Sequence, residues 1–339
     1  MSRLNIGSVF TMTVNRVVAA ILVIGAMVVP LEAAAQAMPK VHRIAFINIG
    51  PAAQNIANVA AFKAGLVDHG YVEGRNVVID FRWGDQKVEQ LPALVNELLA
   101  LKPDVIVSTG GPLTVRAVRA ATTTFPVVFI TGDPVAEGIV QNLARPGGNF
   151  TGIAALGWTL DAKRLEILTQ LVPRAKRIAV VWNPSQPYVE RNFKEVAAAG
   201  KQLGLTLLVW KARDRGELEV VFSEIEKAKP EGLLILADPV LGYERSRLVE
   251  FANANRLPSI YFWREFAQIG GLASYGASLP EAYRSSAKYV DRILKGAKPG
   301  ELAIEQPTKF EFIVNRKTAK AMGLSIPQDV LLRADEVIE

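Results

Sequence analysis

Short runs of β-branched and other apolar residues recur along the first half of the chain and alternate with longer amphipathic segments. The longer segments repeat apolar residues every three or four positions, as in "EQLPALVNELLALK". This alternation predicts parallel strands joined by right-handed helical crossovers. The expected strands of this first series are 42–48, 76–83, 104–109, 126–131 and 150–156.

A second series with the same rhythm follows. Its expected strands are 176–183, 205–212, 231–238, 257–263 and 270–276. The chain then adds an amphipathic segment at 280–295 and an apolar run in "KFEFIVN", which indicates that it crosses back between two lobes. We therefore expect an α/β protein with two Rossmann-like lobes of parallel sheet flanked by helices.

The expected lobe boundaries follow from these two series. The N-terminal lobe takes 38–155 plus 277–298, and the C-terminal lobe takes 156–276 plus 305–339. Small residues and glycines place the hinge near 155–159, 276–278 and 296–306, because such residues absorb backbone rotation easily.

Five expected strands end in a proline that follows Gly, Asn or Asp. Proline suits the first helical position and Asp or Asn before it can cap the free amides, so these turns predict helix starts. They also lie at the carboxyl ends of parallel strands, where ligands bind in open α/β sheets. The turns are "NIGP" (48–51), "TGGP" (109–112), "TGDP" (131–134), "WNP" (182–184) and "ADP" (237–239).

Each turn alone could be a plain helix cap, but their distribution over both lobes favours a ligand cleft. The amides and hydroxyl of 109–111 could hold a carboxylate, and Asp133 or Asp238 could hold an ammonium. Aromatic residues near the ends of second-series strands, Trp182, Tyr261 and Trp263, could pack within the lobe or face the ligand. The candidate ligand-binding residues are Asn48, Thr109, Gly110, Gly111, Thr131, Asp133, Asn183, Asp238, Trp263 and Tyr275.

The first 37 residues have the layout of a secretory signal peptide. Arg3 and Arg16 precede the uncharged run "VVAAILVIGAMVVP", and "LEAAAQA" supplies a small-residue cleavage site. The alternative is an N-terminal anchor helix, although the run is short of the roughly 20 residues that a membrane span needs. No cysteine is present, so neither a lipid anchor nor a disulfide is expected. We expect a periplasmic protein that does not itself span the membrane.

Charge and motifs argue against two other classes. A net charge of +6 spread along 339 residues is a weak signal, and nucleic-acid binding is not expected. Neither G-x-G-x-x-G nor G-x-x-x-x-G-K-[ST] occurs, and the chain has two histidines, His42 and His69. We expect no catalytic residues, no metal site and no cofactor. A hydrolase that uses carboxylates alone is the weakest alternative.

Together, several stretches resemble the bacterial ABC transporter substrate-binding proteins, a family with members that bind aromatic amino acids. They include "AFKAGLVDHGYVEGRNVVIDFRW", "LARPGGNFTGI", "RIAVVWNP", "LPSIYFWREFAQIGGLASYG" and "EQPTKFEFIVNRKTAKAMGLSIP". The resemblance implies a type I periplasmic binding protein with a three-stranded hinge, which delivers a small solute to an inner-membrane ABC permease and carries out no catalysis. The loop "NIGPAAQNIANVAAF" departs from the family because it carries no charge.

Two functions remain open on the sequence. The first is capture of a carboxylate-bearing solute, such as an amino acid, for import. The second is an exported sensor domain of the same fold that signals to a membrane receptor.

Overall fold

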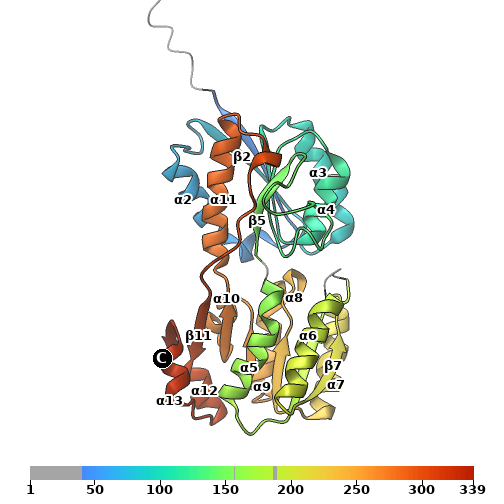
Figure 1. Cartoon of the computed structure of the whole chain (residues 1–339), viewed down its shortest axis with the longest axis vertical. Coiled ribbons are helices and arrows are strands. Elements are labelled where there is room, and N and C mark those ends of the chain that lie inside the picture. The colour runs from blue at the N-terminus through green and yellow to red at the C-terminus, as the bar shows by residue number, and fades with distance from the viewer. Residues whose placement is uncertain (1–39, 156, 186–188) are drawn as a thin grey trace, which may run out of the picture. The chain divides into compact units, whose positions relative to one another are not determined.

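The computed structural model describes residues 40–155, 157–185 and 189–339 (Figure 1). The expected signal peptide therefore lies outside the described residues. The first of two sheets has the order β2-β1-β3-β4-β5, and all its pairs are parallel. Its strands are β1 His42–Asn48, β2 Val77–Trp83, β3 Val105–Thr109, β4 Val127–Thr131 and β5 Phe150–Ala154.

Helices cover both faces of the first sheet. Along β1, Ile44 and Phe46 join one core cluster, whereas Ala45 and Ile47 join another, as the two-residue period of a strand requires. In Figure 1, α2 and α11 lie together over one face, and α3 and α4 lie over the other. The helices of this lobe are η2 Ala52–Gln54, α2 Ile56–Asp68, η3 Val88–Gln90, α3 Leu91–Ala100, α4 Pro112–Ala121, α11 Leu279–Leu294 and η5 Pro299–Glu301.

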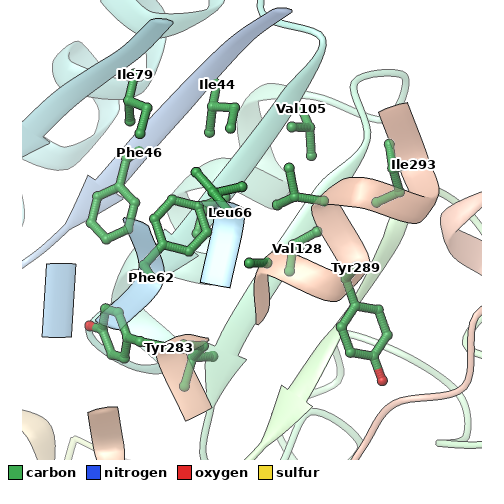
Figure 2. Packing of buried hydrophobic residues seen from close by; sticks show 14 of the residues in the cluster. Ile44, Phe46, Phe62, Leu66, Ile79, Val105, Val128, Tyr283, Tyr289 and Ile293 are labelled. Atoms are coloured by element: carbon green, nitrogen blue, oxygen red, sulfur yellow. The ribbon is translucent and has the colours of Figure 1, made fainter. Parts of the chain in front are cut away.

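Helix α11 belongs to this lobe although it follows both series of strands. Figure 2 shows how Tyr283, Tyr289 and Ile293 of this helix lie in the core that Phe46 and Phe62 also enter. Burying a large apolar side chain contributes about 1.5–3 kcal/mol. Several such side chains therefore hold the returning helix against the first sheet.

The second sheet has the order β12-β11-β10-β9-β8-β6-β7, and only its β10–β11 pair is antiparallel among the described strands. Its strands are β6 Arg177–Trp182, β7 Thr206–Lys211, β8 Gly232–Ile235, β9 Ser259–Tyr261, β10 Ala273–Gly276, β11 Glu311–Asn315 and β12 Glu336–Ile338. The helices of this lobe are η4 Gly157–Leu160, α5 Asp161–Leu171, α6 Val189–Gln202, α7 Arg215–Ala228, α8 Pro239–Tyr243, α9 Arg245–Ala254, α10 Arg264–Gln268, α12 Arg316–Met322 and α13 Gln328–Arg333. The two-lobed α/β fold expected from the alternating pattern is confirmed.

Three segments connect the two sheets. The first follows β5, the second is the short link 277–278 between β10 and α11, and the third is 306–310. The third connection lies later than the range 296–306 that small residues favour. The reason is that Ile304 N–H donates to Leu143 O (2.7 Å) and Glu305 N–H donates to Gly152 O (3.1 Å), which keeps both residues with the first lobe.

Of the five proline turns, two begin a helix directly. Helix α4 starts at Pro112 after Gly111, and α8 starts at Pro239 after Asp238. The turn at 131–134 is a correction, because a single turn follows it rather than a helix. The Asp133 carboxylate accepts from the amides of Val135 (3.2 Å) and Ala136 (3.0 Å), and the chain leaves at Gly138 with φ 69°.

Candidate ligand-binding site

A pocket of about 100 Å³ lies between the ends of the two sheets, where by the same measure a single water needs about 10–15 Å³. Both lobes contribute to its wall, as expected for the carboxyl ends of parallel strands. The polar and glycine residues that line it are Gln54, Asn55, Asn58, Gly110, Gly111, Thr131, Gly132, Gly157, Asp238, Arg245 and Glu265. The other lining residues are Ile130, Ala155, Trp158, Ala237, Pro239, Tyr243, Phe262, Trp263, Ala277, Leu279 and Tyr283.

The glycine turn after β3 forms part of the wall. Gly110 and Gly111 both have positive φ, 85° and 90°, which glycine adopts without strain. A Cβ on Gly111 would lie 2.5 Å from Cγ of Pro239 in the other lobe. No side chain caps α4, which begins at this turn, so its N-terminal amides are suited to an anionic group.

Asp238 lines the pocket, but it also has a structural role. Its Oδ1 accepts from the Leu241 amide at 2.9 Å, which caps α8, and from Asn183 Nδ2 at 3.2 Å. Asn183 itself does not line the pocket, and its Oδ1 accepts from the Ser185 amide. The ligand role of Asp238 stays a prediction.

Two buried acceptor atoms of the pocket residues lack a hydrogen-bond partner within the described structure. They are Oε2 of Glu265, at the start of α10, and Oδ1 of Asn58, in α2. Burial raises the pKa of the Glu265 carboxyl, because the charged form loses its hydration. A ligand that donates hydrogen bonds would satisfy both atoms, one from each lobe.

The positive charge of the pocket comes from Arg245. Its guanidinium donates to the side-chain and main-chain oxygens of Gln54 and to Gly242 O. Burial lowers the pKa of Arg245, and the nearby Glu265 opposes this shift. The pocket thus contains groups of both signs.

Aromatic side chains complete the wall. Trp263 lies edge-on to Phe262 and to Tyr243, with ring centroids 4.9 and 6.3 Å apart. The Arg191 guanidinium lies over the Trp158 ring, with its Cζ atom 4.5 Å from the ring centroid. Such rings provide a large apolar surface for a planar or bulky ligand side chain.

The structure places Asn48 and Thr109 behind the pocket wall. Both are fully buried, and Asn48 Nδ2 donates to Thr109 Oγ1 at 2.9 Å and to Tyr283 Oη at 3.1 Å. Asn48 Oδ1 accepts from the Gly50 amide and from Tyr243 Oη at 2.8 Å. These bonds occupy the polar atoms of Asn48, so its position corresponds to a structural hub rather than to a ligand contact.

Other candidates also lie away from the pocket. Asp133 forms an ion pair with Arg191 at 3.1 Å, and Tyr275 packs against Phe310 and Phe312. Trp182 stacks on Phe193 and Tyr261 stacks on Phe266, each inside the second lobe. Of the predicted residues, those that line the pocket are Gly110, Gly111, Thr131, Asp238 and Trp263.

Comparison with known proteins identifies the family. The model of the family described as ABC transporter substrate binding protein matches residues 41–338. The chain belongs to this family. It is a family of binding proteins rather than of enzymes. Within the described residues, no group of His, Cys, Asp and Glu could hold a metal ion. None of the described helices has the length and hydrophobicity of a membrane span.

Relatives of this substrate-binding chain share its fold. A tyrosine-binding protein of Clostridioides difficile is 25% identical over 275 residues, which cover 78% of this chain and 75% of the relative. A conserved domain protein of Vibrio cholerae matches with TM-score 0.81 and 25% identity, over 88% of this chain and 100% of that one. A Streptococcus protein in complex with L-Trp matches with TM-score 0.80 and 22% identity, over 88% and 99%.

Most of the lining residues were not predicted from the sequence, and Asn58, Arg245 and Glu265 are the most important of them. Asn58 stands among apolar residues in the first half of α2, and a polar residue on an inward helix face is a usable signal. Glu265 comes two residues after Trp263 at a helix start, which could have drawn attention to it. Arg245 follows a short helix, α8, and gives no local signal.

Proposed function

We propose that this chain is the solute-binding component of an ABC importer and that its solute is an amino acid with an aromatic side chain. The observation that carries the proposal is the pair of unpartnered acceptors, Glu265 Oε2 and Asn58 Oδ1, in a pocket walled by aromatic rings. The tyrosine-binding relative and the L-Trp complex of a structural neighbour support the same class of ligand.

Glu265 and Asn58 would bind the α-ammonium group. A carboxylate held in a desolvated site gains most from a cationic donor, because it has lost its hydration. Asp238 is less suited to this role, since it already accepts from Leu241 and Asn183.

The start of α4 would bind the α-carboxylate. Its uncapped amides and the positive end of the helix dipole attract an anion, and glycine lets the backbone approach it closely. Glu265 lines the same pocket as Gly110 and Gly111, so a small ligand could contact both the carboxyl group and the start of α4.

The rings of Trp158, Phe262 and Trp263 would enclose the ligand side chain. The lobes would open and close about the three connections, and the closed form would deliver the solute to an inner-membrane permease. Export to the periplasm fits this role.

Calorimetric titration of the purified protein tests the proposal. We expect L-tyrosine, L-tryptophan or L-phenylalanine to bind, and the same molecules without the carboxylate or without the ammonium to bind at least about 10-fold more weakly, since a charge-assisted hydrogen bond contributes about 1.5–3 kcal/mol. Failure of all three aromatic amino acids to bind would refute the proposal.

Glu265→Gln tests the ammonium site directly. It should weaken binding by about 10- to 100-fold, the equivalent of one charge-assisted bond. The melting temperature without ligand should stay equal or rise, because the substitution removes a desolvated carboxylate. Glu301→Gln is the matched control, since Glu301 is exposed and lies outside the pocket. Equal affinities of the two variants would exclude Glu265 as the ammonium ligand.

A further inference from the structure

Three consecutive residues of the second lobe each contact the first lobe. Tyr243 Oη donates to Asn48 Oδ1 at 2.8 Å, and its carbonyl accepts from Gln54 Nε2 at 3.1 Å. Glu244 Oε1 accepts from Gln86 Nε2 at 3.1 Å. Arg245 donates to both oxygens of Gln54. We call residues 243–245 the clasp.

The most deeply inserted part of the clasp is the Tyr243 ring, which enters the core of the first lobe. It is 6% exposed and belongs to the same apolar cluster as Ile47 and Ile49 of the first lobe. The space comes from Gly50, where a Cβ would lie 2.2 Å from the ring carbon Cζ. The ring therefore fits only because this position lacks a side chain.

The loop that presents Gln86 is held in an unfavourable conformation. Asp85 and Gln86 have φ of 47° and 63°, in the left-handed region that non-glycine residues avoid. Two backbone bonds fix the loop to the end of β1: Gly84 N–H to Asn48 O at 2.9 Å, and Gln86 N–H to Ile49 O at 2.7 Å. Backbone strain that surrounding bonds maintain is concentrated at sites with a function. Here it points the Gln86 side chain at Glu244.

We propose that the clasp determines ligand affinity by stabilising the closed lobes, with Gln86 and Glu244 as positioning residues that do not touch the ligand. Neither Gln86 nor Glu244 lines the pocket, whereas Tyr243 and Arg245, on either side of Glu244 in the sequence, do. The clasp thus couples the pocket wall to lobe closure. The effect on affinity rests on the proposed function, whereas the effect on closure does not.

An ion pair outside the clasp also joins the two lobes, but it is weaker. Arg191 and Asp133 form an ion pair at 3.1 Å, but the Arg191 side chain is 55% exposed. Exposed ion pairs contribute little because water and salt screen them. Glu244 is 7% exposed and Tyr243 is 6% exposed, so the clasp loses less to solvent.

An added negative charge in the clasp provides the binding test. Gln86→Glu places a second carboxylate against Glu244, and we expect Kd to rise about 10-fold, because a partly buried hydrogen bond is replaced by like-charge repulsion. Adding Glu244→Gln should restore Kd to within about 2-fold, since a Glu–Gln pair forms again. Gln90→Glu is the matched control, because it adds the same charge to an exposed position of the same lobe.

A distance measurement tests closure without ligand. The chain has no cysteine, so spin labels can be attached at Thr123→Cys in one lobe and Lys227→Cys in the other without further changes. Gln86→Glu should shift the label distance distribution toward an open form, and Glu244→Gln should reverse the shift. If Gln86→Glu behaves like Gln90→Glu in this measurement, or if Glu244→Gln does not rescue it, the clasp proposal is wrong. The distance measurement is informative even if no amino acid binds, because it is made without ligand.

Discussion

Gly50→Ala is the substitution that separates lobe closure from folding most clearly. The new Cβ would lie 2.2 Å from Tyr243 Cζ and 2.3 Å from Cε1, whereas carbon atoms in ordinary contact are about 3.5–4.0 Å apart. The ring would have to move by more than about 1 Å, and the neighbouring bond from Tyr243 Oη to Asn48 restricts that movement.

The expected magnitude follows from overpacking, which costs about 1–3 kcal/mol in a well-packed site. Opening the lobes relieves the clash. The overpacking therefore destabilises the closed, ligand-bound form relative to the open form, and it does not destabilise the folded lobes themselves. Kd should rise by about 5- to 150-fold. The melting temperature without ligand should be equal or slightly higher. Where φ suits alanine, Gly→Ala stabilises a protein by about 0.4–1 kcal/mol, because it restricts the unfolded chain. Gly50 meets this condition, since it is not among the positive-φ glycines of the described chain.

Titration calorimetry and thermal unfolding of Gly50→Ala measure both quantities. Gly216→Ala is the control, since Gly216 lies in α7, away from both the pocket and the clasp. An unchanged Kd, whatever the melting temperature, would show that the Tyr243 ring does not control closure.

Two further predictions concern the turn at 131–138. Asp133→Asn should change Kd by less than about 3-fold in the same titrations, because the side chain can still cap its turn and loses only a partly exposed ion pair with Arg191; a loss of 10-fold or more would restore Asp133 as a ligand contact. Burial raises the pKa of Glu137 from 4.5 to about 7, so the folded state binds the extra proton and the free energy of unfolding should fall as pH rises from about 4.5 to 7. Glu137→Gln should flatten this fall in urea unfolding measured across that range, and an unchanged slope would contradict the assignment.

Much of the fold could be predicted because its elements are local. The alternation of Ile44, Ala45, Phe46 and Ile47 between two clusters is what a strand covered by helices on both faces requires. The short strand β12, at 336–338, gave no comparable signal, because three residues cannot establish a period.

The site was predicted only in part, for a physical reason. Gly110, Gly111 and Asp238 could be placed at the pocket because strand ends and helix starts fix them. Asn48 occurs in the same kind of turn, yet its bonds to Thr109, Tyr283 and Tyr243 turn it into the core. Which polar side chain faces the ligand depends on such long-range partners, and a single sequence does not reveal them.

A crystal structure of the complex with the aromatic amino acid that binds most tightly tests the central claim most directly. The account predicts the ammonium nitrogen within about 3.2 Å of a Glu265 oxygen and of Asn58 Oδ1, and the carboxylate at the Gly110 and Gly111 amides. A ligand that places its ammonium elsewhere, and leaves Glu265 without a partner, would contradict it.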